Sequence, residues 1–112
     1  MKLMASVQLF RGLADATRVR ILNVLTQAKQ MNGTEIADLL RVPRARVARH
    51  LRYLYRSRLV TTRRKGPETF YGLRVEGNEP IHVAISDIID GHLKHLEGLE
   101  KDNEAIKVSG EH

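Results

Sequence analysis

Residues 41–65 read RVPRARVARHLRYLYRSRLVTTRRK, a stretch with ten lysines and arginines and no aspartate or glutamate. Its first half places Val47, Leu51 and Leu54 at helical spacing, so one face of a helix is apolar. Its second half changes to strand-forming residues over 59–62. The stretch therefore predicts a helix that packs on one face and carries arginines on the others, followed by a strand.

Charge is distributed unevenly along the chain. Residues 1–40 have a net charge of +2, residues 41–75 of +10 and residues 76–112 of −6, for a total of +6. Nucleic acid favours such a basic cluster, because each neutralised phosphate releases condensed counterions. A merely solvated face usually alternates in sign, and this cluster contains no acid. We therefore expect the middle segment to contact double-stranded DNA and the acidic last third to lie away from it.

Three further helical patterns precede the basic helix. Gly12 can end the first, and the Asp15 carboxylate can cap the free amides of the second. Asn32 and Glu35 have the spacing of a capping box for a third, short helix. Pro43 then interrupts the pattern and is tolerated at the start of the next helix. The expected helices cover residues 1–12, 16–28, 33–41 and 44–56.

The C-terminal half contains a hairpin and a long amphipathic segment. A turn at Lys65-Gly66-Pro67 predicts a hairpin over 59–74 with a basic tip. Pro80 opens a segment over 79–102 whose apolar residues form one broad helical stripe, which indicates a partner surface. Residues 103–112 have a weak pattern and are expected to form a flexible tail.

This order of elements is that of a helix-turn-helix with a wing. Residues 13–22, LADATRVRIL, are similar to the L-A-D-P-T-R-x-x-I-L opening of the ArsR/SmtB family of small dimeric winged-helix repressors. The segments EIADLL, HLRYL and FYGL, at 35–40, 50–54 and 70–73, are in register with the helix-turn-helix and wing of that family. Several short motifs in the right order are more specific than any one of them. The chain thus resembles this family over roughly residues 3–100.

The resemblance implies a mainly α fold with a β-hairpin wing, built as one domain over residues 1–102. The helix-turn-helix would span 33–56, the wing 59–74, and the terminal helices 1–12 and 79–102 would dimerise. The implied function is that of a homodimeric repressor that binds an inverted-repeat operator. The residues expected to bind DNA are Arg44, Ala45, Arg46, Ala48, Arg49, His50, Arg52, Arg63, Arg64 and Lys65. The residues expected at the dimer interface are Leu3, Val7, Phe10, Ile81, Ile85, Ile88, Ile89, Leu93 and Leu96.

The chain departs from the family pattern near the expected DNA-binding helix. Arg41 and Arg58 stand where relatives often have glycine, in the turn and before the first wing strand, and Pro43 stands where they often have a capping serine. The reading face carries arginines where relatives have small or polar residues. Arginine can contact guanine edges or phosphates, so the operator sequence cannot be transferred from the family.

Sensing is a second departure. The chain has no cysteine, which excludes disulfides and thiolate metal sites. His82, His92 and His95 resemble part of another family metal site, but Pro80 replaces its aspartate and the spacing is one residue short. We therefore expect no metal and no cofactor, with the inducer unknown. Two alternatives stay open: a zinc- or nickel-responsive repressor that uses these histidines, and a winged-helix module that binds an acidic protein or RNA.

Other classes of protein have little support in the sequence. No serine has a neighbouring base or an oxyanion-type glycine motif, and there is no glycine-rich phosphate loop, so an enzyme is not expected. No run of about 18 apolar residues and no signal peptide is present. We therefore expect a cytoplasmic protein without a membrane span.

Overall fold

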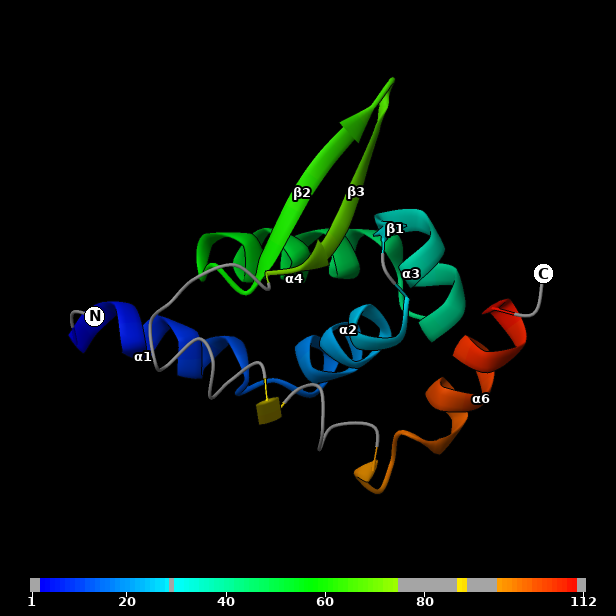
Figure 1. The fold of residues 1–112 in the computed structure, drawn as a ribbon, viewed down its shortest axis with the longest axis horizontal. Helices are drawn as coiled ribbons and strands as arrows, with labels where there is room; N and C mark the ends of the chain where they lie inside the picture. The colour runs from blue at the N-terminus through cyan, green and yellow to red at the C-terminus, as the bar shows by residue number, and fades with distance from the viewer. Residues whose placement is uncertain (1–2, 29, 75–86, 89–94, 111–112) are drawn as a thin grey trace.

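The computed structural model describes residues 3–28, 30–74, 87–88 and 95–110. Four helices form the body, a β-hairpin projects from it, and a C-terminal helix packs at the opposite end (Figure 1). The helices are α1 (Leu3–Gly12), α2 (Ala16–Gln27), α3 (Gly33–Leu40), α4 (Arg44–Arg56) and α6 (Glu100–Gly110). The strands are β1 (Met31–Asn32), β2 (Val60–Lys65) and β3 (Glu68–Leu73).

The core lies where α2, α3 and α4 meet. Each of these helices buries the apolar face that its periodicity predicts, and removal of that surface from water is the main stabilising contribution. On α4 the buried face is the one identified in the sequence, so the arginines are left on the other faces. The residues at most 1% exposed are Ile21, Leu22, Asn23, Val24, Ile36, Val47, Leu51 and Leu54.

Both predicted helix caps at the start of α2 and α3 are confirmed. Asp15 accepts hydrogen bonds from the backbone amides of Thr17 and Arg18, at 2.8 and 3.1 Å. Asn32 and Glu35 form the reciprocal capping box, in which each side chain accepts a hydrogen bond from the other's backbone amide, at 2.8 and 3.0 Å. These contacts satisfy amides that a helix start leaves without a backbone acceptor.

The ends of α3 and α4 share one geometry. Each is followed by an arginine in the left-handed region, Arg41 with φ of 57° and Arg58 with φ of 62°. The next amide then bonds back across the last turn, from Val42 to Ala37 and from Leu59 to Leu54, as in a Schellman motif. Glycine is the usual residue at this position, and both arginines stand where the resembled family often has it.

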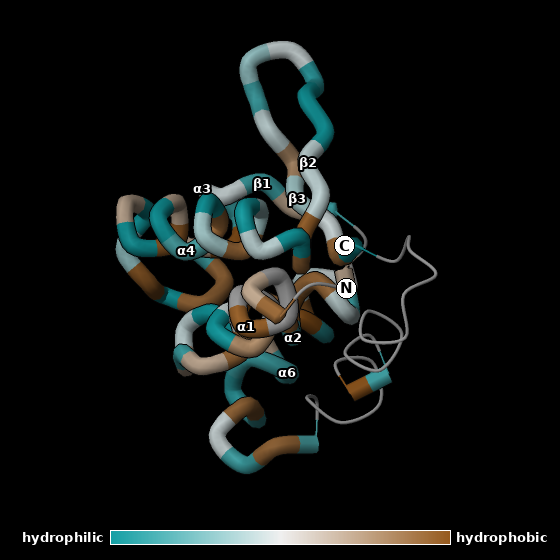
Figure 2. Tube along the Cα trace, turned by 90° about the vertical axis from the view of Figure 1, so that its left-hand side faces the viewer, coloured by the Kyte–Doolittle hydropathy of each residue, from teal (hydrophilic) through white to brown (hydrophobic). Residues whose placement is uncertain are grey.

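The wing is a hairpin with a short third strand. β2 and β3 pair from Val60 opposite Leu73 to Lys65 opposite Glu68, and Gly66 in the turn has φ of 60°. A positive φ at the first turn position suits a two-residue hairpin loop. β1 pairs with the other edge of β3. A strand of two residues is too short to be predicted from a sequence pattern. Figure 2 shows the hairpin standing clear of the body, with hydrophilic residues on both arms.

The C-terminal region differs from its prediction. The flexible tail predicted for 103–112 is instead, up to Gly110, part of helix α6, whose Ile106 is 7% exposed. The pattern was weak because α6 buries one apolar side chain and is otherwise fixed by polar contacts to α2, from Asp102 and Asn103. The predicted helix over 79–102 falls largely outside the described residues. Within its described part, residues 87–88 are helical, 95–99 form a turn and 100–102 belong to α6. Over the described ranges, no helix is long and apolar enough to cross a membrane.

A stability measurement tests the geometry after α4. Arg58→Gly should raise the free energy of unfolding by about 1 kcal/mol, because glycine adopts a positive φ without a Cβ clash. Arg52→Gly, in the middle of the same helix, should lower it by about 1 kcal/mol. Urea unfolding of both variants measures the difference, and a loss of stability in Arg58→Gly would contradict the assigned conformation.

Candidate DNA-binding surface

The predicted reading face of α4 is open to solvent. Apart from Ala48, which is half-buried, and His50, which is buried, the predicted residues of α4 are all exposed. They occupy the faces of the helix that Val47, Leu51 and Leu54 leave free. The exposed members are Arg44, Ala45, Arg46, Arg49 and Arg52.

Acidic groups do little to neutralise this face. The described part of the chain shows one ion pair from an α4 arginine to an acid, Arg44 Nη2 to Asp38 Oδ1 at 3.8 Å. Both side chains are about two-thirds exposed, at 68% and 67%. Exposed pairs of this kind contribute little, so Arg44 can exchange Asp38 for a stronger anionic partner.

The wing carries a second group of exposed cations. Arg63, Arg64 and Lys65 lie at the end of β2, next to the hairpin turn. Lys65 Nζ lies 5.5 Å from the centre of the Phe70 ring on β3, a cation–π contact that steadies the tip. In both Figure 1 and Figure 2 the hairpin projects beyond α4.

His50, one of the predicted DNA contacts, is buried. It is 8% exposed, and its ring faces inward between Arg18 and Asp15. Nδ1 lies 3.4 Å from Arg18 Nη1, and Nε2 lies 3.8 Å from Asp15 Oδ1. The ring therefore contributes to the packing of α4 on α2.

Burial and charge act together on this pair of titratable groups. Burial lowers the pKa of His50; the Asp15 carboxylate opposes that shift, whereas Arg18, Arg49 and Arg46 reinforce it. The pKa of Asp15 is lowered in turn, because two backbone amides and the charges of His50 and Arg18 outweigh the effect of its burial. When the ring is uncharged, its Nδ1 can accept a hydrogen bond from Arg18.

Arg18 is a structural residue that the sequence reasoning missed. Its Nε donates to the Gly12 carbonyl at 3.1 Å and its Nη2 to the Arg11 carbonyl at 2.8 Å, both at the end of α1. The same guanidinium stacks 4.2 Å from the centre of the Tyr53 ring on α4. Arg18 thus joins α1 to α4, and the sequence signal for it was the Thr17-Arg18 pair in the family-like motif.

The structure describes five of the nine predicted dimer residues. On α1, Leu3 is 77% exposed and Phe10 is 55% exposed, while Val7 is half-buried. Ile88 is 49% exposed. Leu96 is partly buried against the core of its own chain. The remaining candidates, Ile81, Ile85, Ile89 and Leu93, lie outside the described residues.

Only one of the three candidate metal-ligating histidines lies in the described part of the chain. His82 and His92 lie outside the described residues, and His95 is exposed. Where the structure is described, no three His, Cys, Asp or Glu side chains come together as metal ligands would. Metal response through these histidines stays a prediction.

Comparison with known proteins assigns the family. Residues 15–62 match the family described as bacterial regulatory protein, arsR family. The transcriptional repressor PagR of Bacillus anthracis is 31% identical over 80 residues, which are 69% of this chain and 80% of PagR. The chain belongs to the ArsR family. The ArsR-family matches are transcriptional regulators rather than enzymes, and the helix-turn-helix and wing of this chain are the DNA-binding fold of such regulators.

Further relatives extend the comparison. The transcriptional regulator KmtR of Mycobacterium tuberculosis is 40% identical over 83 residues, 74% of this chain, and the chain spans 61% of KmtR. The crystal structure of PagR superposes with a TM-score of 0.60 at 27% identity, covering 75% of this chain and 92% of PagR. The homodimeric winged helix-turn-helix domain Mb0332 of Mycobacterium bovis shares the fold, with a TM-score of 0.65 at 24% identity over 85% of this chain and 87% of that domain.

The buried histidine makes stability depend on pH in this ArsR-family protein. Its folded pKa lies below the ordinary 6.5, so the unfolded chain binds more protons as the pH falls through about 6.5. The contribution of His50 to the free energy of unfolding is therefore fully present above that pH. It is lost as the pH falls below it, by at most about 1.4 kcal/mol per pH unit. His50→Gln should remove this part of the pH dependence. Urea unfolding of the wild type and of His50→Gln at about pH 7.5 and about pH 5.5 tests this. The same loss of unfolding free energy between the two pH values in both proteins would refute the lowered pKa of His50.

Proposed function

We propose that this chain is a homodimeric transcriptional repressor that binds an inverted-repeat operator through α4 and the wing. The observation that carries the proposal is the division of α4 into a buried apolar face and an exposed face with four arginines, Arg44, Arg46, Arg49 and Arg52. A helix of this kind fits the major groove, where arginine makes bidentate contacts to guanine. Membership of a family of DNA-binding regulators supports this role.

The wing would extend the contact beyond the major groove. Arg63, Arg64 and Lys65 are exposed at the end of β2, in a hairpin that stands clear of the body (Figure 2), so they could reach the neighbouring phosphate backbone. Phosphate contacts fix the register of a protein on DNA, whereas base contacts give sequence preference. We therefore assign positioning to the wing and sequence reading to the N-terminal half of α4.

A dimer would supply the twofold symmetry that an inverted repeat requires. Leu3, Met4 and Phe10 leave an apolar surface on α1 exposed, at 77%, 60% and 55%. Large apolar side chains grouped on one short helix favour a protein partner. Mb0332, which shares the fold, is described as homodimeric, and PagR is named a repressor. Two copies of α4 would then lie about 34–36 Å apart, one turn of DNA.

DNA affinity tests the reading face. Arg46→Ala should weaken binding to the duplex upstream of the protein's own gene by more than about tenfold, because each base contact is worth about 1–3 kcal/mol and a dimer loses two. Lys107→Ala on α6 removes the same charge from an exposed position away from α4 and should change affinity by less than about twofold. Fluorescence anisotropy measures both, and equal affinities would refute the placement.

Sedimentation tests the dimer surface. At micromolar concentration the wild type should sediment as a dimer, and Phe10→Glu should sediment as a monomer, because burial of a carboxylate in an apolar interface is costly. Tyr55→Glu, at a side chain 51% exposed on α4, is the matched control and should stay dimeric. A wild-type monomer, or a dimer that tolerates Phe10→Glu, would contradict the assigned interface.

A further inference from the structure

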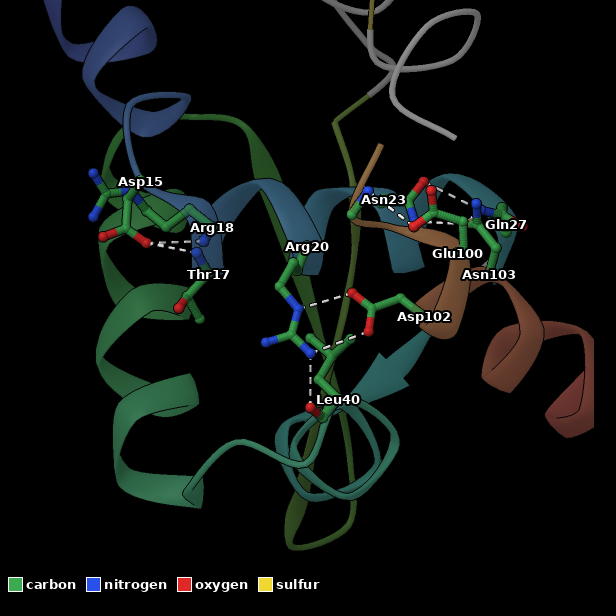
Figure 3. A network of polar contacts seen from close by, with 11 residues as sticks. Asp15, Thr17, Arg18, Arg20, Asn23, Gln27, Leu40, Glu100, Asp102 and Asn103 are labelled. Atoms are coloured by element: carbon green, nitrogen blue, oxygen red, sulfur yellow. Dashed lines mark hydrogen bonds and ion pairs between the residues drawn. The ribbon is translucent and has the colours of Figure 1, made fainter. Parts of the chain in front are cut away.

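The C-terminal helix α6 is joined to the helix-turn-helix by one arginine of α2. Arg20 Nε donates to Asp102 Oδ2 at 2.8 Å, and Arg20 Nη2 donates to Asp102 Oδ1 at 3.0 Å, a two-point contact with a carboxylate of α6 (Figure 3). The same Nη2 also donates to the backbone carbonyl of Leu40 at 2.8 Å. One guanidinium thus bridges α6 and the last residue of α3.

The Leu40 carbonyl lies at the turn of the helix-turn-helix. Leu40 ends α3, and Arg41, with its left-handed φ of 57°, follows as the first residue of the turn that leads to α4. The last carbonyls of a helix have no partner within the helix. At this end Ala37 receives the amides of Arg41 and Val42, and Leu40 receives the Arg20 side chain. The path of the chain into α4 is therefore fixed from outside α3.

Burial makes the orientation of Arg20 depend on Asp102. The Asp102 side chain is 7% exposed and that of Arg20 is 32% exposed, so water replaces their contact poorly. The hydrogen bond to Asp102 also raises the pKa of Arg20, against the opposite effect of burial, which keeps the guanidinium charged. Asn103 of α6 adds a second tie, accepting hydrogen bonds from the buried Asn23 and from Gln27 of α2, at 2.8 and 3.0 Å.

We propose that Asp102 is a positioning residue for DNA recognition: through Arg20 and the Leu40 carbonyl, α6 sets the angle at which α4 meets the operator. This inference rests on the proposed DNA-binding function. Asp102 belongs to a helix outside residues 15–62, the segment that matches the family, and it lies on the acidic third of the chain. Its negative charge opposes DNA binding by Coulomb repulsion, whereas its contact with Arg20 promotes specific binding.

The loss of the Asp102 charge and the loss of its contact with Arg20 therefore predict opposite changes in DNA affinity for Asp102→Asn. Loss of a negative charge alone would tighten binding to any DNA. Loss of the fixed guanidinium should weaken binding to the operator duplex by about three- to tenfold and leave binding to a scrambled duplex unchanged or slightly tighter. Glu104→Gln, an exposed residue of the same helix, removes the same charge and should not weaken binding to either duplex. Asp102→Glu keeps the carboxylate and should recover part of the lost affinity.

The measurement is fluorescence anisotropy on both duplexes, at a temperature where circular dichroism shows each variant folded. Arg20→Lys is the second test if Asp102→Asn does not fold. It keeps the net charge but loses the fork that spans Asp102 and Leu40, and operator binding should again weaken selectively. Folded variants that bind the operator as tightly as Glu104→Gln would overturn the inference. A wild type that binds both duplexes alike would instead contradict the proposed function.

Discussion

Everything that this molecule presents to DNA depends on the burial of one face of α4. Val47, Leu51 and Leu54 are at most 1% exposed, and they hold the helix against α2 and α3. With that face occupied, the arginines of α4 can only lie at the surface, where they repel one another. Among the described residues, Asp38 is the one acid that pairs with an α4 arginine, Arg44. The hydrophobic contact thus holds together a charge distribution that is unfavourable until a polyanion binds.

Two arginines of α2 connect this helix to the ends of the chain. Arg18 ties the last carbonyls of α1 to His50 and Tyr53 of α4. Arg20 ties Asp102 of α6 to the end of α3 (Figure 3). Both point away from the hydrophobic centre and satisfy backbone carbonyls that helix ends leave open. The position of α4 relative to α1 and α6 therefore depends on polar contacts with defined geometry as well as on packing.

The parts of the fold that follow from local chemistry were predictable. Asp15 and Asn32 act as caps within three residues of their partners, and the apolar spacing in α4 identified its buried face. Long-range contacts were not predictable in this way. The Arg20–Asp102 pair joins residues 82 positions apart, and α6 is held largely by such polar contacts, so its sequence resembled a tail. The burial of His50 was not foreseen, because spacing alone does not distinguish the edge of a buried face from the edge of a binding face.

The most direct test of the central claim is the preference of the purified protein for its own promoter. Fluorescence anisotropy would compare the duplex upstream of its gene with a scrambled duplex of equal length at physiological salt. If α4 reads a defined sequence, affinity for the upstream duplex should exceed that for the scrambled one by about a thousandfold or more. Equal, weak and salt-sensitive binding to both would show that the arginines of α4 grip phosphate without reading bases, and would contradict the claim.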